Sequence, residues 1–588
     1  MPKVWRFANH DEAVVKELCR SLSISPLMAR VLVARGNCTP QQVLTFLDAK
    51  LTDLHNPDVL PGISEAADRI VNAIRSGRRV TIFGDYDVDG IVSTSILWYC
   101  LKLENATVDY HIPSRLTDGY GLNGETLRQF HEEDPDRLVV TVDCGITNIE
   151  EVRLARELGL EMIVTDHHRY GDELPEANVL VHPRLPGSEY PFGELCGAGV
   201  AFKLAWAICK RLGDGEKSTP RMREFLKNAV GLAAIGTVAD VVPLVGENRV
   251  IVRYGLANLA EYALPGLQAL MKVSGVEPGS LMQSDSEIGF KIAPRINAAG
   301  RLGQARLAVE LLTTNNNDRA NQLANYLDEL NKNRRTVETR MLKKAKSLVA
   351  DHPEWEEQAA LVIAQHDWHP GVIGIVANRI AEHYEKPTVL ISLDRETNIG
   401  QGSGRSFAGF DLHSGLAACE KHLLSFGGHR AAAGVRIHAD HINAFRESFH
   451  QYVTENHQLN ERDIEQTVDA EVQLSEVTLR AVRELDRLGP FGQANTRPVF
   501  AATRVELAGP PKTMGDGGRH LSLKVRQYGA QLRAVAFGHG NWAEEIAEHG
   551  GPIDLCFSAN INRFRGRENV DLFLNDWRPS VSNIPVTS

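Results

Sequence analysis

The sequence has little cysteine and no cysteine motif. Its eight cysteines are scattered over 588 residues, and none forms a CxxC pair. Isolated thiols are typical of a reduced protein, and they argue against both a disulfide framework and a zinc site built from thiolates. We therefore predict a cytoplasmic protein.

Long apolar runs are also missing. No run can span a bilayer, and the first residues, Met1 to Arg6, are followed by polar and charged groups rather than by the apolar core of a signal peptide. No membrane attachment is expected. Hydrophobic content of 43% and charged content of 24% fit a globular protein. A chain of this length implies about three to five domains.

The chain has no excess of positive charge. A formal net charge of −11 argues, at face value, against a nucleic-acid partner. However, carboxylates that hold metal ions add negative charge that the ions cancel locally, and binding depends on where charge lies. Basic clusters do occur, at Arg334-Arg335, at Lys343-Lys344 with Lys346, and at Arg563, Arg565 and Arg567.

Three aspartates alternate in one short stretch, Phe83–Gly90. Asp85, Asp87 and Asp89 lie between a β-type run and the start of a helical one. Carboxylates crowded in this way repel one another unless a cation neutralises them. The alternative is a solvated turn or a helix cap, because Asp caps helices well. Taken alone, this stretch leaves the two readings evenly matched.

The stretch from about 78 to 185 alternates apolar strands and helices, which predicts a parallel sheet with ligands at its carboxyl edge. Asp143 follows the run Leu138–Val142, and Asp166-His167-His168 follows Met162–Thr165. A later apolar helix ends in Asp240. Each residue could be an unrelated cap or turn, but their convergence favours a site for Mg²⁺ or Mn²⁺, which prefer oxygen ligands.

Three further segments follow. Residues 316 to 350 lack Pro and Gly and predict one long helix, whose cations face either a substrate channel or solvent. Residues 355 to 458 form a second α/β unit, with glycine-rich anion-binding loops at Gly402–Ser406 and Gly427–Arg430. After residue 465, short strands between turns predict a small antiparallel barrel.

Asp85–Gly90, Val142-Asp143, Asp166-His167-His168 and Asp240 resemble the successive motifs of the DHH phosphoesterase superfamily, and within it those of the RecJ single-strand-specific 5′→3′ exonucleases. Further stretches share this resemblance, which covers nearly the whole chain: Pro113-Ser114-Arg115, Asp118–Leu122, Gly236–Leu244, Pro294–Arg301, Trp368–Gly374, Gly402–Ser406, Gly427–His429 and Ala431–Gly434.

The resemblance implies a multidomain α/β fold. Residues 1–75 would be a helical lead-in packed on the catalytic domain. Residues 76–312 would form the parallel-sheet DHH catalytic domain, 313–352 the connecting helix, 353–460 a DHHA-type substrate-binding domain, and 461–588 an OB-fold-like antiparallel barrel that binds nucleic acid. Phe564 beside the arginines fits that use, whereas Phe500, Phe537, Phe557 and Trp577 are predicted to lie in the barrel core.

The resemblance also implies two ions, Mn²⁺ or Mg²⁺. Asp143 would bridge them, Asp87 with Asp85 would hold the first, and Asp89, His167 and Asp240 would hold the second. Asp166 would orient an imidazole, and His168 would contact the scissile phosphate. Substrate-binding residues would be Arg115, Arg301, Ser403, Gly404, Arg405, Gly428 and His429.

The implied function is hydrolysis of single-stranded DNA from its 5′ end to 5′-mononucleotides, in DNA recombination and repair. Single-stranded DNA, a single-strand-binding protein and a RecQ-type helicase are the implied partners of a monomer. Some relatives place a metal-binding His where this chain has Phe83. Open alternatives are a phosphodiesterase acting on short oligonucleotides or cyclic dinucleotides, a non-catalytic single-strand-binding scaffold, and a pyrophosphatase.

Overall fold

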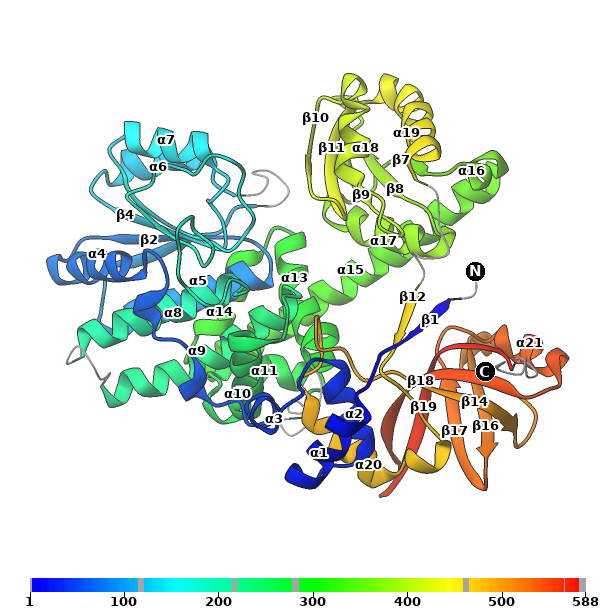
Figure 1. Ribbon diagram of the computed structural model, residues 1–588. Coiled ribbons are helices and arrows are strands. Elements are labelled where there is room, and N and C mark those ends of the chain that lie inside the picture. The colour runs from blue at the N-terminus through cyan, green and yellow to red at the C-terminus, as the bar shows by residue number, and fades with distance from the viewer. Residues whose placement is uncertain are drawn as a thin grey trace. The chain divides into compact units, whose positions relative to one another are not determined.

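The computed structural model describes residues 3–114, 121–213, 219–277, 285–457, 465–564 and 566–580. Two of the residues with predicted roles, Arg115 and Arg565, lie outside these ranges, as does the side chain of Phe564. The chain forms two compact units (Figure 1). The larger contains residues 50–459 and 492–494, and the smaller contains residues 1–49, 460–491 and 495–588.

The larger unit begins with the predicted parallel sheet. Its strand order is β3-β2-β4-β5-β6, and every neighbouring pair is parallel. The central strands β2 and β4 are buried along their whole length, as their continuous apolar runs require. Edge strand β3 is mostly half-buried and was not expected from the sequence. The strands are β2 (Val80–Gly84), β3 (Val108–His111), β4 (Leu138–Val142), β5 (Glu161–Thr165) and β6 (Val179–Val181).

Helices α4, α5, α7 and α8 contact the strands of this sheet. Helix α5 is apolar on almost every side because it packs against α8, α9 and α14. Among the described residues, no helix is both long and apolar enough to cross a membrane. The helices are α4 (Ile63–Ser76), α5 (Val88–Leu103), α6 (Gly124–Glu133), α7 (Ile149–Glu157), α8 (Gly197–Leu212), α9 (Pro220–Ala239), α10 (Gly246–Tyr262), α11 (Pro265–Val273), α12 (Asp285–Glu287), α13 (Ala293–Arg301) and α14 (Ala305–Thr313).

The predicted long helix is α15 (Asn317–Asp351), and Asn316 caps it by accepting from the Arg319 amide. It contacts α11, α13 and α17. A mixed sheet follows in the order β10-β11-β9-β8-β7. Its elements and neighbours are α16 (Pro353–Glu357), β7 (Leu361–His366), α17 (Pro370–Tyr384), β8 (Thr388–Leu393), β9 (Ile399–Arg405), α18 (Leu412–Ala417), β10 (Ser425–Gly428), β11 (Ala432–His438) and α19 (Ile442–Asn456).

The prediction of a loop at Gly402–Ser406 is wrong for most of its length, because residues 402–405 lie in β9. Strand β9 pairs with β8 on one side and with β11 on the other. Glycines here allow close packing between strands: a Cβ on Gly402 would come within 2.5 Å of Val435. Glycine-rich composition therefore marks a crowded strand rather than a turn.

The smaller unit contains the predicted C-terminal β-domain. Strand β14 pairs with β18 and also with β16, so the sheet returns on itself. Most pairings are antiparallel, as predicted, but β17 and β19 are parallel. The elements are β12 (Glu465–Val468), β13 (Ala470–Glu471), α20 (Leu479–Leu485), β14 (Phe500–Leu507), β15 (Lys512–Met514), β16 (His520–Gln527), β17 (Ala530–Ala536), α21 (Trp542–His549), β18 (Ile553–Phe564) and β19 (Arg567–Pro579).

The N-terminal segment differs from its prediction. Its strand β1 (Val4–Phe7) pairs with β12, and its helices α1 (Glu12–Leu22), α2 (Pro26–Ala34) and α3 (Pro40–Leu47) share one core with α20 and the barrel. Residues 1–49 thus fall in the same compact unit as the C-terminal β-domain. The apolar faces of these helices were visible in the sequence, but such a face does not specify its partner.

Candidate metal centre

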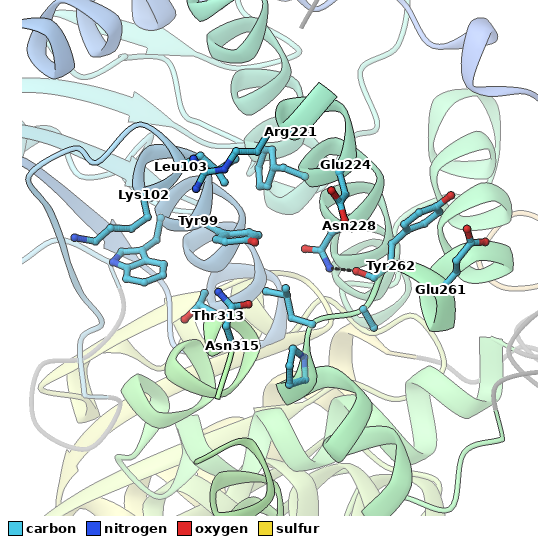
Figure 2. Close-up of a pocket in the computed structure, with 15 residues that line it drawn as sticks. Tyr99, Lys102, Leu103, Arg221, Glu224, Asn228, Glu261, Tyr262, Thr313 and Asn315 are labelled. Carbon is cyan, nitrogen blue, oxygen red and sulfur yellow. Dashed lines mark hydrogen bonds between the residues drawn. The ribbon is translucent and has the colours of Figure 1, made fainter. Parts of the chain in front are cut away.

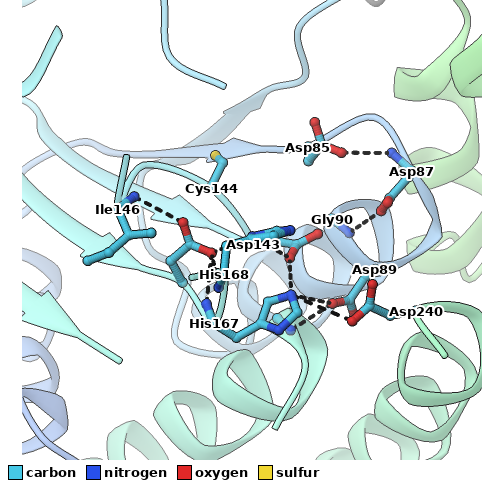
Figure 3. A network of polar contacts seen from close by, with 12 residues as sticks. Asp85, Asp87, Asp89, Gly90, Asp143, Cys144, Ile146, His167, His168 and Asp240 are labelled. Atoms are coloured by element: carbon cyan, nitrogen blue, oxygen red, sulfur yellow. Dashed lines mark hydrogen bonds and ion pairs between the residues drawn. The ribbon is translucent and has the colours of Figure 1, made fainter. Parts of the chain in front are cut away.

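Acidic residues follow three neighbouring strands where those strands end together. Gly84 pairs with Val142, and Val142 pairs with Thr165, so the carboxyl ends of β2, β4 and β5 are level. The residues immediately after them are Asp85, Asp143 and Asp166. The sheet register therefore brings to one edge side chains that are widely separated in sequence (Figure 3).

One group of potential ligands contains Asp85, Asp87 and Asp143, whose ligand atoms all lie within 4.8 Å of one another. Asp87 is also a helix cap, because its Oδ1 accepts from the Gly90 amide at 3.1 Å. Asp85 Oδ1 is buried and has no hydrogen-bond donor among the residues that the structure describes. A buried anionic oxygen without a donor is costly, and a cation would satisfy it.

A second group contains Asp89, His167 and Asp240. His167 Nε2 lies 3.8 Å from Asp89 Oδ2 and 3.6 Å from Asp240 Oδ2. The same nitrogen is 3.2 Å from Asp143 Oδ1, so Asp143 connects the two groups. His168 is close as well, and with Asp143 and His167 it forms a third possible group.

The backbone at Asp143 is held in an unusual conformation, with φ of 61°. This left-handed region is tolerated by Asp better than by most residues, but it still carries strain. This left-handed conformation turns the chain after β4, and the Asp143 carboxylate lies where the two groups meet. The φ value could not be read from the sequence, whereas the family resemblance already implied a bridging role for Asp143.

Burial and crowding make these carboxylates hard to ionise without a cation. Burial raises the pKa of Asp143 well above its ordinary value, and Asp89 and Asp87 raise it further. Burial and the charge of Asp89 also raise the pKa of Asp240 to about 8. The pKa of Asp85 is raised by burial and by Asp87. Hard divalent cations bind carboxylate-rich sites, and an imidazole can join the oxygen ligands, so the donor set fits Mn²⁺ or Mg²⁺.

Helix α8 supports the second group, and the sequence analysis missed this contribution. Asp89 Oδ2 accepts from the Gly197 amide at 2.6 Å, and Asp89 Oδ1 accepts from the Ala198 amide at 2.9 Å. These are unpaired amides of the first turn of α8, where the helix dipole favours negative charge. The only hint in the sequence was a glycine pair, Gly197 and Gly199, at the start of an apolar helix.

Asp166 holds its loop and one imidazole rather than joining a ligand group. Its Oδ1 accepts from the amides of His167 and His168 and lies 2.7 Å from His168 Nδ1, while its Oδ2 accepts from the Ile146 amide. Burial alone would raise the pKa of Asp166, but the contact with His168 outweighs it and lowers that pKa to about 2. Asp166 thus orients the imidazole of His168.

Phe83 belongs to neither group. Its ring is fully buried in a core with Leu127 and Phe130, and it stacks on His111 at a centroid distance of 5.2 Å. Phe83 is therefore a core residue. Within the described part of the chain, the first group consists of three carboxylates, Asp85, Asp87 and Asp143, with no imidazole.

Three predicted phosphate-binding residues meet at the first turns of α17. Arg301 Nη1 donates to the Gly371 carbonyl at 3.2 Å. Arg405 Nη1 donates to Ser403 Oγ at 3.0 Å, and a Cβ on Gly374 would lie 2.8 Å from Arg405 and 3.0 Å from Ser403. Cationic and hydroxyl groups thus gather at the positive end of a helix.

The remaining predicted substrate residues lie elsewhere on the same sheet. Gly404 pairs with Ala433, which in turn pairs with Gly428, so Gly428 lies two strands from Gly404. His429 follows β10 and is exposed. The predicted substrate-binding residues of the mixed sheet therefore extend from β9, beside α17, to the edge strand β10.

Family models match three parts of the chain: "DHH family, N-terminal domain" at residues 79–237, "DHHA1 domain" at 357–455 and "RecJ OB domain" at 468–576. The parallel sheet with its acidic edge, together with these matches, defines a protein of the DHH superfamily.

Relatives that align with nearly the whole chain identify the family within this superfamily. A Bacillus subtilis protein named single-stranded-DNA-specific exonuclease RecJ is 37% identical over 97% of this chain and 70% of its own length. The Escherichia coli protein of the same name is 33% identical over 95% of this chain and 96% of its own length. The chain belongs to the RecJ family.

Solved structures agree with this assignment. Thermus thermophilus RecJ in complex with Mn²⁺ matches with a TM-score of 0.81 and 32% identity, covering 99% of this chain and 80% of that one. The same protein in complex with Mg²⁺ matches with a TM-score of 0.75 and 30% identity, covering 99% and 79%. The predicted family and multidomain fold class are confirmed.

Proposed function

We propose that this chain is a metal-dependent exonuclease that hydrolyses single-stranded DNA from its 5′ end and releases 5′-mononucleotides. The observation that carries the proposal is the pair of carboxylate-rich groups joined through Asp143, in a chain whose full-length relatives are named single-stranded-DNA-specific exonucleases. A scaffold that had lost catalysis would not need to retain both groups.

Asp85, Asp87 and Asp143 would hold one Mn²⁺ or Mg²⁺ ion, and Asp89, Asp143, His167 and Asp240 the other. Two such ions, when bound, stabilise the charge that develops on a phosphodiester during in-line displacement. Asp166 fixes His168 through the 2.7 Å contact, and we assign to His168 a hydrogen bond to the scissile phosphate. Removing Asp166 would free the ring and the loop together.

The first turns of α17 would bind the 5′ end of the strand. Arg405 and Arg301 supply planar guanidinium groups suited to phosphate oxygens, and Ser403 supplies a hydroxyl. Gly300, the neighbour of Arg301, packs so closely on the first acidic motif that a Cβ there would lie 2.0 Å from the Tyr86 carbonyl. Helix α13 thus contacts both the first acidic motif, at Tyr86, and the first turn of α17, at Gly371.

The C-terminal barrel would bind the rest of the strand. Its exposed Phe537 contacts Phe573 edge to face at 5.4 Å, and such rings stack on bases of any sequence. The prediction that Phe537 lies in the barrel core is wrong, since 56% of this residue is exposed, whereas Phe500 and Phe557 are buried. The predicted protein partners, a single-strand-binding protein and a RecQ-type helicase, remain proposals from the family resemblance.

A digestion assay tests direction and strand preference. Single strands labelled at either end, and a matched blunt duplex, are incubated with protein and Mn²⁺. We expect the 5′ label to appear first as mononucleotide and the duplex to persist. Earlier release of the 3′ label, or equal digestion of the duplex, would contradict the proposal.

A further inference from the structure

A cavity lies at one end of two helices, α5 and α9, whose other ends adjoin the metal groups. Helix α5 begins beside Asp87, and α9 ends beside Asp240, whereas the cavity is lined by the last turns of α5 and the first turns of α9 (Figure 2). Its volume is about 520 Å³, within the range typical of small-molecule sites. Sixteen residues of α5 span about 24 Å, so the cavity is separate from the metal centre.

A buried amide in this cavity lacks a donor. Asn228 is only 5% exposed, and its Nδ2 donates to the Tyr262 carbonyl at 2.8 Å. Its Oδ1 accepts no hydrogen bond from any residue that the structure describes, and Figure 2 shows this oxygen turned toward Tyr99. A buried acceptor without a donor costs about 1–3 kcal/mol, which a ligand N–H would recover.

Aromatic rings and charged groups of both signs complete the lining, because Glu224 and Glu261 line the cavity as well as Lys102 and Arg221. Tyr99 meets Phe225 edge to face at 5.5 Å, and Trp98 lies beside them under Lys102, whose Nζ is 5.7 Å from the indole centroid. Arg221 is exposed at the rim and has no ion-pair partner within the described part of the chain. The cavity thus offers flat apolar surfaces, one unsatisfied acceptor, two carboxylates and, at its rim, the guanidinium of Arg221.

We propose that this cavity binds a nucleoside monophosphate. The base would lie against Tyr99 and Trp98 and donate an amino hydrogen to Asn228 Oδ1, and the phosphate would pair with Arg221. An amino-bearing base suits a lone amide acceptor, so adenine, cytosine and guanine nucleotides are the expected ligands. The proposal does not depend on the exonuclease activity, because none of these residues belongs to the metal centre.

Isothermal titration of the full-length Asp143→Ala protein in EDTA tests this site without interference from the metal centre. With dAMP and dCMP we expect saturable binding with a Kd of about 1 mM or tighter. Arg221→Ala and Asn228→Ala, each added to that background, should weaken binding at least tenfold. Arg223→Ala, an exposed arginine of the same helix outside the cavity, should leave it unchanged.

Two further probes identify what is recognised. Deoxyribose 5-phosphate and inorganic phosphate should bind at least tenfold more weakly than dAMP, because they lack the base. Equal binding of phosphate would reduce the cavity to an anion site and overturn the proposal. So would an absence of saturable dAMP binding, or binding that the exposed, fold-neutral substitution Arg221→Ala does not change.

Discussion

Two glycines determine how closely α8 and α9 approach the acidic groups. A Cβ on Gly197 would lie 2.5 Å from Asp143 Oδ1, and one on Gly236 would lie 2.5 Å from Asp89 Oδ1. These contacts are too short to keep, so any larger residue must displace a carboxylate. The glycines therefore position the predicted ligands without touching substrate.

Gly197→Ala should weaken Mn²⁺ binding about 10- to 100-fold, the usual range for a residue that orients metal ligands. Titration of Mn²⁺ followed by electron paramagnetic resonance measures this directly. Gly199→Ala, two residues further along α8, is the matched control, because its Cβ would meet only the flexible end of Leu195 at 3.1 Å. Equal loss in both variants would point to helix damage instead.

Many individual residues of the acidic site could be predicted, because they directly follow apolar strands. Asp143 and His167 were found from the runs that precede them, since parallel strands end at one edge. The support for Asp89 could not be found, because the Gly197 amide is a backbone donor more than a hundred residues away. Sequence patterns carry side-chain chemistry, whereas backbone donors become visible only in the fold.

Among the secondary-structure elements, the start of α17 is where recognition of the strand end is expected. Arg405→Ala should raise KM for 5′-phosphorylated strands about tenfold or more, since hydrogen bonds to charged groups contribute about 1.5–3 kcal/mol. It should change KM for 5′-hydroxyl strands little. The exposed Arg436→Ala on the neighbouring strand β11 serves as control. Equal losses on both kinds of end would argue against recognition of the terminal phosphate.

Helix α15 contains a buried charge cluster that the sequence could not distinguish from a solvated face. Glu338 is buried and lies 2.7 Å from Arg334 and 2.9 Å from Arg379, so this stretch of the helix is tied to α17. Glu338→Gln should lower the free energy of unfolding by about 3–5 kcal/mol, because it leaves Arg334 buried and unpaired.

Urea unfolding followed by circular dichroism measures the Glu338 effect, with the exposed Glu329→Gln on the same helix as control. A cost near zero for Glu338→Gln would mean that the cluster is solvated. The length of α15 itself was predictable, since a stretch without Pro or Gly and with helical spacing favours one continuous helix. The partners of its charges were not, because they come from another element.

For the whole molecule, the net charge of −11 is not in conflict with strand binding, because the acidic residues include the clustered metal groups.

Phe537→Ala in the barrel should weaken binding to single-stranded DNA by about 1–3 kcal/mol, the range for one base stacked on an aromatic ring. Fluorescence anisotropy with Asp143→Ala protein measures binding without digestion. Tyr528→Ala, an exposed aromatic in the turn at the other end of β17, is the control; equal losses would contradict a specific platform at Phe537.

Domain order could be predicted at this scale, but not the grouping of the N-terminal segment. Short strands between turns identified the C-terminal barrel, and the alternation of strands and helices identified the two α/β parts. The association of residues 1–49 with the barrel is a contact between distant segments, and the amphipathic pattern of α1–α3 fits any apolar surface.

The release of 5′-labelled mononucleotides from single-stranded DNA by the wild-type chain and by Asp143→Ala, with and without Mn²⁺, tests the central claim most directly. We predict rapid Mn²⁺-dependent release by the wild type and none by the variant, which should still bind the strand. Full activity in Asp143→Ala, or equal wild-type activity in EDTA, would contradict a reaction that depends on two metal groups joined through this carboxylate.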